Sequence, residues 1–159
     1  MGKRSVKENK NIYQLLREEA GLTREEAAEK AVFVSADRIE KIESGRSPIH
    51  PDEVAVLADC YRAPQLKNLY CARECPLGVL TVPEIPDKNL PEIVLQLLNE
   101  LNGLDEERNR LIEIVSDGRI SKEETPDFTR IHDRLKKVAS LSASLQLFME
   151  KQQAKAMSK

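Results

Sequence analysis

The spacing of apolar and polar positions along the chain predicts helices. Between residues 11 and 70, apolar residues recur at intervals of three and four in five short runs, which is the spacing of amphipathic helices. Thr23 and Ser35 precede the second and third of these runs and are good N-caps, whereas Gly21 and Gly45 follow the ends of the first and third. This part of the chain is therefore expected to form five short helices.

Two longer apolar stripes follow in the second half of the chain. The first runs from 90 to 115 and begins at a capping box of Asn89 and Glu92, and a second box of Ser121 and Glu124 precedes the other stripe. Two such helices joined by a short turn form an antiparallel hairpin. The stripe residues are Leu90, Val94, Leu97, Leu101, Leu104, Leu111 and Val115 in the first run, and Phe128, Ile131, Leu135, Val138, Leu145 and Met149 in the second.

Residues 71–88 hold three prolines and one glycine, so they are predicted to be a linker without a regular helix. The expected fold class is all-α. The expected parts are a basic arm at 1–10, a five-helix domain at 11–70, the linker at 71–88, the hairpin at 89–154 and a frayed tail at 155–159.

Composition narrows the class of protein. The 159 residues are 40% hydrophobic and 33% charged with no Trp, which fits a helical chain with an aliphatic core. No apolar stretch is long enough to cross a membrane, and the basic N-terminus is not followed by an apolar run, so we predict neither a membrane span nor a signal peptide, and a cytoplasmic location. Three cysteines, an odd number, are expected to be reduced thiols.

Two segments of the first domain carry familiar motifs. LLREEAGLTREEAAEKA spans 15–31, and VSADRIEKIESGRSPIHPDEVAVLADCY spans 34–61. With them, residues 11–70 resemble the lambda-repressor-like helix-turn-helix domain of the Xre type. The resemblance implies a five-helix module whose third helix, the recognition helix, enters the major groove of double-stranded DNA.

The resemblance also implies which residues touch DNA. The recognition helix would begin at Ser35, and Glu43 would have a structural role. The implied contacts are Ser35, Asp37, Arg38 and Lys41 at base edges or nearby phosphates, Arg24 at a phosphate or base, and Arg17 and Arg46 at the phosphate backbone.

Charge limits this interpretation. The whole chain has a net charge of -2, and residues 11–70 hold 8 basic against 11 acidic residues, so attraction to DNA must be local. The arm at 1–10 carries a net charge of +3 and is expected to reach phosphates or a groove. The family usually turns between its second and third helices with a glycine, whereas this chain has Val32 and Phe33 and is one residue longer there. A helical domain whose charges form a solvated face is the alternative.

The hairpin is expected to form a homodimer. Two recognition helices related by a two-fold axis and spaced one DNA turn apart, roughly 34 Å, would match a near-palindromic operator. The alternative is that both stripes pack against each other and the linker within a monomer. The residues expected at the interface are Leu97, Leu101, Leu104, Leu135, Val138 and Leu145.

Other chemistry is not expected. Cys60, Cys71 and Cys75 include no CxxC pair, and only His50 and His132 are present to complete a metal site, so the thiols are interpreted as small buried hydrophobes rather than as metal ligands or a redox pair. Neither histidine has the setting of a catalytic base, so we expect no enzyme and no cofactor.

Three functions remain open from the sequence. The favoured one is a sequence-specific transcriptional repressor that occupies a promoter as a homodimer. The second is a protein-interaction adaptor that keeps the helix-turn-helix fold without binding DNA. The third is the antitoxin of a toxin-antitoxin pair, with the hairpin as the surface for the protein partner.

Overall fold

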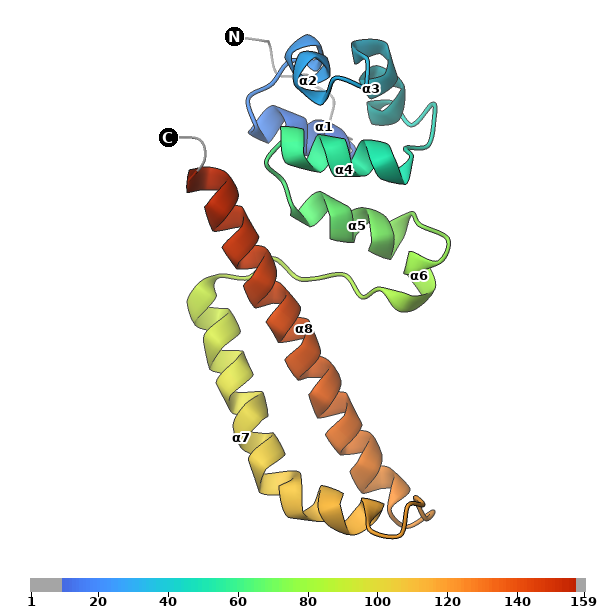
Figure 1. Cartoon of the computed structure of the whole chain (residues 1–159), viewed down its shortest axis with the longest axis vertical. Helices are drawn as coiled ribbons and strands as arrows, with labels where there is room; N and C mark the ends of the chain where they lie inside the picture. Colours follow the sequence, from blue (N-terminus) through green and yellow to red (C-terminus); the bar gives the residue numbers. More distant parts are fainter. Residues whose placement is uncertain (1–9, 157–159) are drawn as a thin grey trace. The chain divides into compact units, whose positions relative to one another are not determined.

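The structure is a computed structural model that describes residues 10–156, and these residues form helices and connecting segments without a strand (Figure 1). The expected all-α fold class is confirmed. The helices are α1 Ile12–Glu19, α2 Arg24–Ala31, α3 Ala36–Glu43, α4 Pro51–Cys60, α5 Gln65–Arg73, α6 Gly78–Thr81, α7 Leu90–Val115 and α8 Thr125–Ala156.

The chain divides into two compact units. Within the described residues, the first unit comprises 10–84 together with 150–156, and the second comprises 85–149. The predicted basic arm at 1–9 and the last residues, 157–159, lie outside the described part of the chain. The predicted frayed tail at 155 begins too early, because α8 continues to Ala156.

Helices α1 to α5 surround one apolar core. Small residues such as Ala27 and Ala58 are fully buried and let their helices approach closely. The buried core residues are Tyr13, Leu16, Ala27, Ala31, Val34, Ile39, Ile42, Ile49, Val54, Leu57, Ala58, Tyr61, Ala63 and Leu66.

Side-chain caps fix the starts of the first three helices. The side-chain oxygens of Asn11, Thr23 and Ser35 accept hydrogen bonds from backbone N–H groups in the first turns of α1, α2 and α3. At α2, Glu26 completes a capping box with Thr23. The helix starts expected at Thr23 and Ser35 are thus confirmed.

The segment expected to be a linker is partly helical, which corrects the prediction for 71–88. Helix α5 continues to Arg73, and α6 follows within the segment. The guanidinium of Arg73 donates two hydrogen bonds to Glu84, at 2.7 and 2.6 Å. A Cβ at Gly78 would collide with the backbone carbonyl of Cys71, so glycine permits this close approach. Residues up to 84 are therefore fastened to the end of the first unit.

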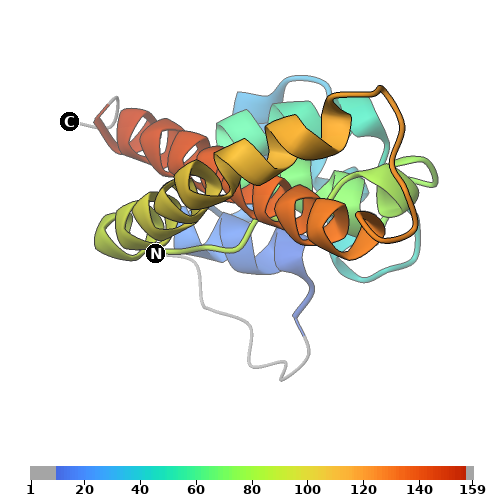
Figure 2. The ribbon, with the colours of Figure 1, turned by 90° about the horizontal axis from the view of Figure 1, so that it is seen from below.

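Helices α7 and α8 lie beside each other in Figure 1 and cross at an angle in the view of Figure 2, and the segment 116–124 connects them. Ion pairs join Arg130 to Glu107 and Arg134 to Glu100, an order that only antiparallel helices produce. The predicted helix from 90 to 115 and the antiparallel hairpin are confirmed.

The buried face of α7 differs from the predicted stripe. Ile93 and Ile114 are buried near its two ends, one position away from the predicted Val94 and Val115, which are partly exposed. Between them Glu100 and Glu107 reach Arg134 of α8, beside the half-buried Leu97 and Leu104. The hairpin is thus closed by apolar residues near the ends of α7 and an ionic layer in the middle.

Candidate nucleic-acid interface

Helices α2 and α3 are joined by a tight and strained turn. Phe33 N donates a 2.5 Å hydrogen bond to Ala31 O, and Val32 between them has φ +58° and ψ −43°, which is the arrangement of a γ-turn with positive φ. A β-branched residue rarely adopts positive φ. Val32 therefore supplies here the conformation for which glycine would be the ordinary choice.

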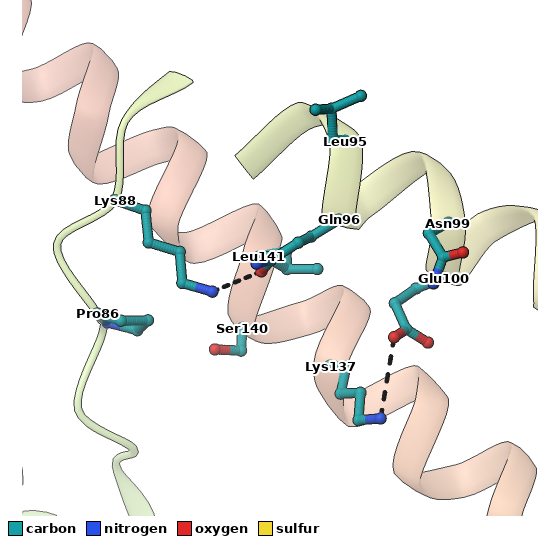
Figure 3. A pocket seen from close by; sticks show the side chains of 9 residues that line it. All are labelled: Pro86, Lys88, Leu95, Gln96, Asn99, Glu100, Lys137, Ser140 and Leu141. Atoms are coloured by element: carbon teal, nitrogen blue, oxygen red, sulfur yellow. Dashed lines mark hydrogen bonds and ion pairs between the residues drawn. The ribbon is translucent and has the colours of Figure 1, made fainter. Parts of the chain in front are cut away.

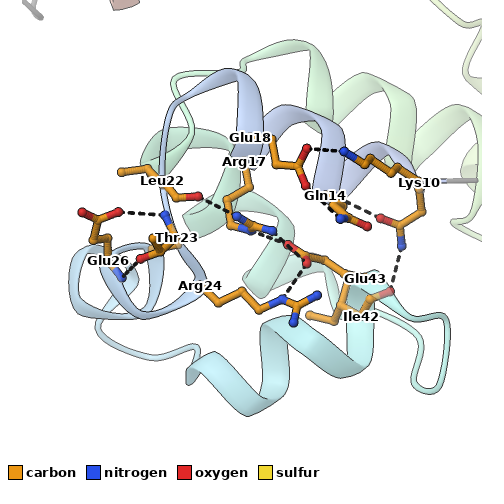
Figure 4. A network of polar contacts seen from close by, with 12 residues as sticks. Lys10, Gln14, Arg17, Glu18, Leu22, Thr23, Arg24, Glu26, Ile42 and Glu43 are labelled. Atoms are coloured by element: carbon orange, nitrogen blue, oxygen red, sulfur yellow. Dashed lines mark hydrogen bonds and ion pairs between the residues drawn. The ribbon is translucent and has the colours of Figure 1, made fainter. Parts of the chain in front are cut away.

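A buried carboxylate holds α1, α2 and α3 together (Figure 4). The Glu43 side chain is 1% exposed and accepts hydrogen bonds from Arg17 Nε at 2.5 Å, Arg17 Nη2 at 3.1 Å and Arg24 Nε at 2.8 Å. Arg17 Nη1 also donates to Leu22 O at 2.5 Å. The structural role expected for Glu43 is confirmed by this network.

The sequence predicted Arg17 at the phosphate backbone. The structure corrects this, because Arg17 is buried against Glu43. The residue is 7% exposed. Burial opposes the charge of Arg17, but the hydrogen bonds and the negative charge of Glu43 raise the pKa of its guanidinium above the ordinary value. Arg24 differs, because its side chain remains 36% exposed while it bonds to Glu43.

Arg38 fastens α3 to the start of α4. Its Nε and Nη2 donate to the two carboxylate oxygens of Glu53 at 2.6 and 2.7 Å, and other guanidinium hydrogens reach Ser47 Oγ at 2.5 Å and Pro48 O at 2.7 Å. Hydrogen bonds from Arg38 lower the pKa of the Glu53 carboxyl. In this structure Arg38 holds helices together, so it differs from the expected base contact.

The outer face of α3 carries the remaining predicted contacts. Ser35 is exposed at its start, where its hydroxyl accepts from Arg38 N at 3.2 Å. Lys41 Nζ donates to Asp37 at 2.7 Å, and both side chains are exposed. The hydrogen bond from Lys41 lowers the pKa of Asp37. Exposed ion pairs contribute little to stability, so Lys41 can exchange its partner for a phosphate at low cost.

Arg46 lies just beyond the end of α3. Its guanidinium pairs with Glu40 and also donates from Nε to Ser44 Oγ at 2.9 Å, with more than half of the side chain exposed. The structure thus places Asp37 and Lys41, one turn apart, on the exposed side of α3, with Ser35 exposed at the N-cap and Arg46 just beyond the end of the helix.

The exposed apolar turn at Val32 and Phe33 is not among the contacts predicted from the sequence. Val32 is 76% exposed and Phe33 is 87% exposed, whereas Val34 is buried. The signal in the sequence was a run of three apolar residues directly before an N-cap, of which a tight turn can bury only some.

Comparison with known families identifies this unit. Residues 14–67 match the family model described as a helix-turn-helix domain. This part of the chain is a helix-turn-helix domain. No curated protein and no solved structure matches the chain.

A helix-turn-helix domain indicates a DNA-binding regulator and is typically not an enzyme. Among residues 10–156, no group of three or more His, Cys, Asp or Glu side chains is arranged to hold a metal ion. Cys60, beside the domain core, is half-buried, and burial raises the pKa of its thiol. No helix in the described part of the chain has the length and apolar character that a membrane crossing requires.

The second unit, the hairpin, carries an open hollow of about 520 Å³ between its helices (Figure 3). Lys88 Nζ donates to Gln96 Oε1 at 2.5 Å there, and Lys137 Nζ lies 3.9 Å from Glu100. The hollow is lined by Pro86, Lys88, Leu95, Gln96, Asn99, Glu100, Lys137, Ser140 and Leu141.

The leucine stripe lies on the other side of the hairpin. On α7 the predicted stripe falls about a quarter of a turn from the buried line, in the direction opposite to the residues that line the hollow. On α8 the predicted stripe includes the buried Ile131 and also lies on the side away from Lys137 and Ser140 of the hollow. Because both helices contribute to one hollow, both stripes share the remaining side. Leu101 is 44% exposed and Leu135 is 46% exposed, and Leu97, Leu104, Val138 and Leu145 are partly buried.

Proposed function

We propose that the protein is a sequence-specific DNA-binding transcriptional regulator, a repressor that acts as a homodimer on a near-palindromic operator. The observation that carries this proposal is the helix-turn-helix domain with an exposed outer face on α3. Asp37 and Lys41 lie on that face and Ser35 stands at the start of the helix, while the apolar residues of α3, Ile39 and Ile42, are buried in the domain core.

Two groups of contacts would hold the DNA. Ser35, Asp37 and Lys41 would meet base edges or adjacent phosphates in the major groove, and the partly exposed Arg24 and Arg46 would bind the phosphate backbone on either side. Arg38 would position α3 against α4 and would not contact a base, because its guanidinium is already bonded to Glu53. Most of the binding free energy should come from phosphates and should fall steeply with salt.

The half-exposed leucine stripes of the hairpin support the homodimer in this proposal. A two-fold axis would bring the stripe of one copy against the same stripe of a second copy, which gives a self-complementary contact. The two helices alone bury few apolar residues, chiefly Ile93, Ile114, Ile131 and Leu141, and a four-helix arrangement would cover the half-exposed leucines as well. Repression would then follow from occupation of a promoter.

The acidic surplus favours a second candidate, a protein-interaction adaptor. Residues 11–70 hold more acidic than basic side chains, and Arg17, Arg38 and Arg46 all pair with carboxylates within the domain. Such a surface attracts DNA weakly. An adaptor, or an antitoxin that uses the hairpin, would carry a protein partner through purification, whereas the proposed regulator requires only DNA.

The test is to pass fragmented genomic DNA from the source organism over the immobilised full chain at roughly physiological salt and to sequence what is retained. The proposal predicts one or a few enriched sites, each with two-fold symmetry and half-sites one helical turn apart. Retention of no sequence above input, by protein whose helical circular dichroism is intact, would contradict it and favour the adaptor.

A further inference from the structure

The turn before the recognition helix presents an unusual apolar surface. Phe33 is the most exposed of the large apolar side chains in the described residues, at 87%, and its neighbour Val32 is also exposed. The residues on either side, Ala31 and Val34, are buried in the domain core. The buried residues on both sides therefore fix the backbone so that the side chains of Val32 and Phe33 remain exposed to solvent.

The backbone at this point is strained as well as anchored. Val32 has a positive φ, which a β-branched residue rarely adopts, and the γ-turn bond from Phe33 N to Ala31 O fixes the path of the chain. Such strain persists where the surrounding structure imposes it and is concentrated at binding sites. The turn thus displays Phe33 at the cost of backbone strain.

Phe33 also occupies a position from which DNA bases can be reached. It lies two residues before Ser35, the N-cap of α3, and the N-terminal residues of a recognition helix contact base edges in the major groove. The one arginine within α3, Arg38, is bonded to Glu53 and Ser47. An apolar contact from Phe33 would therefore add to the polar contacts proposed for Ser35 and Asp37 at this end of the helix.

We propose that Phe33 packs against the C5-methyl groups of thymines and so selects thymine in the operator at the position facing the start of α3. The thymine methyl is the apolar feature of the major groove, and aromatic side chains contact it. Cytosine and guanine present no such group. This inference rests on the proposed DNA-binding function and names one determinant of its specificity.

The experiment uses the operator retained from genomic DNA, with each thymidine replaced in turn by deoxyuridine. This change removes the C5-methyl group of the base and keeps its hydrogen-bonding edge. Wild-type affinity should fall about fourfold at one or two symmetry-related thymines in each half-site, as expected for one lost methyl contact. The Phe33→Ala variant should bind the unmodified operator at least fourfold more weakly and should not respond to uracil at those positions.

A matched control is Leu80→Ala, which removes a comparably exposed apolar side chain from α6. This variant should keep both the wild-type affinity and the response to uracil. Equal binding of thymine and uracil operators by the wild type, or an unchanged affinity of Phe33→Ala, would overturn the inference. The inference would also be overturned if Phe33→Ala left DNA binding intact but lost a co-purifying protein or halved the mass of the assembly.

These failures differ from failure of the proposed function. If no genomic sequence is retained by the wild type, the regulator proposal fails before any uracil is introduced, and the inference fails with it. If an operator is found and uracil has no effect, the regulator proposal stands and only the role of Phe33 is removed.

Discussion

Val32 shows how one residue can carry a backbone cost for the helix-turn-helix domain. Its positive φ is strained for a β-branched side chain, by about 1–3 kcal/mol in general. Glycine adopts this conformation freely but loses more entropy on folding, about 0.5–1 kcal/mol. We therefore expect Val32→Gly to raise the free energy of unfolding by about 1 kcal/mol in urea titrations, with an unchanged m-value.

Gly45 provides the opposite control. It has φ +71° with open space around the position of a Cβ, so Gly45→Ala should lower the free energy of unfolding by about 1 kcal/mol through backbone strain alone. If Val32→Gly destabilised the domain as much as Gly45→Ala, the strained γ-turn would be the wrong description of residue 32.

Single residues also mark the limit of sequence-based prediction at the site. Ser35 and Glu43 could be assigned from local motifs, because capping and the buried exit of α3 depend on neighbours in sequence. The partner of Arg38 could not, since Glu53 lies fifteen residues further along the chain and meets it only when α4 packs beside α3. An arginine that is exposed to bind DNA cannot be distinguished in the sequence from one that is bonded within the domain.

The contact between α3 and α4 gives a prediction about pH. Hydrogen bonds from Arg38 hold the pKa of the Glu53 carboxyl below its ordinary value of 4.5 in the folded protein. The stabilisation is therefore complete above pH 4.5 and is lost as the pH falls through the lower, folded value. Wild type should be more stable than Glu53→Gln at neutral pH, and the difference in unfolding free energy should shrink as the pH falls below 4.5.

The measurement is the free energy of unfolding of both proteins across this range. Glu25→Gln removes an exposed carboxylate from α2 and controls for the loss of one acidic group. A wild-type advantage over Glu53→Gln that stayed constant with pH would show that the pair does not couple folding to protonation.

The hairpin shows why element boundaries were easier to predict than helix faces. Asn89 and the turn after Val115 locate the ends of α7 from local chemistry. Its buried face depends on α8, because Arg134 reaches Glu100 and Glu107 across the hairpin and makes polar positions internal. The spacing of apolar residues alone therefore predicted the neighbouring stripe as the buried face.

Gly103 tests the ionic layer within this element. A Cβ at 103 would collide with the guanidinium of Arg134. With Arg134→Ala in place the collision disappears, and Gly103→Ala should then stabilise α7 by about 1 kcal/mol through helix propensity. In the wild-type background the same change should gain less or destabilise, because it displaces Arg134 from Glu100 and Glu107.

The four proteins of a double-mutant cycle are wild type, Gly103→Ala, Arg134→Ala and the double variant. Amide hydrogen exchange measures the stability of α7 in each of them. The expected result is a coupling of about 1 kcal/mol or more between positions 103 and 134. Additive effects would mean that Arg134 does not pack over Gly103.

At the scale of the whole molecule, the proposed dimer depends on the leucine stripes of the hairpin. Leu101 is half exposed within one chain, so Leu101→Lys should leave the fold intact and prevent a second copy from docking. Sedimentation should give twice the 18.0 kDa chain mass for wild type and the single mass for this variant. Asn102→Lys adds the same charge at the next, exposed position and should remain dimeric. A monomeric wild type would contradict the proposed assembly.

The central claim is that the outer face of α3 distinguishes one DNA sequence from another. The most direct measurement compares the affinity of the full chain for its selected operator and for a scrambled duplex of equal length, in wild type, Lys41→Glu and Lys67→Glu. Both lysines are exposed and pair with an aspartate, but Lys67 lies on α5. Wild type should prefer the operator by about a thousandfold or more at physiological salt. Lys41→Glu should lose at least tenfold in operator affinity while Lys67→Glu retains it, and equal effects of the two, or no operator preference in wild type, would contradict the account.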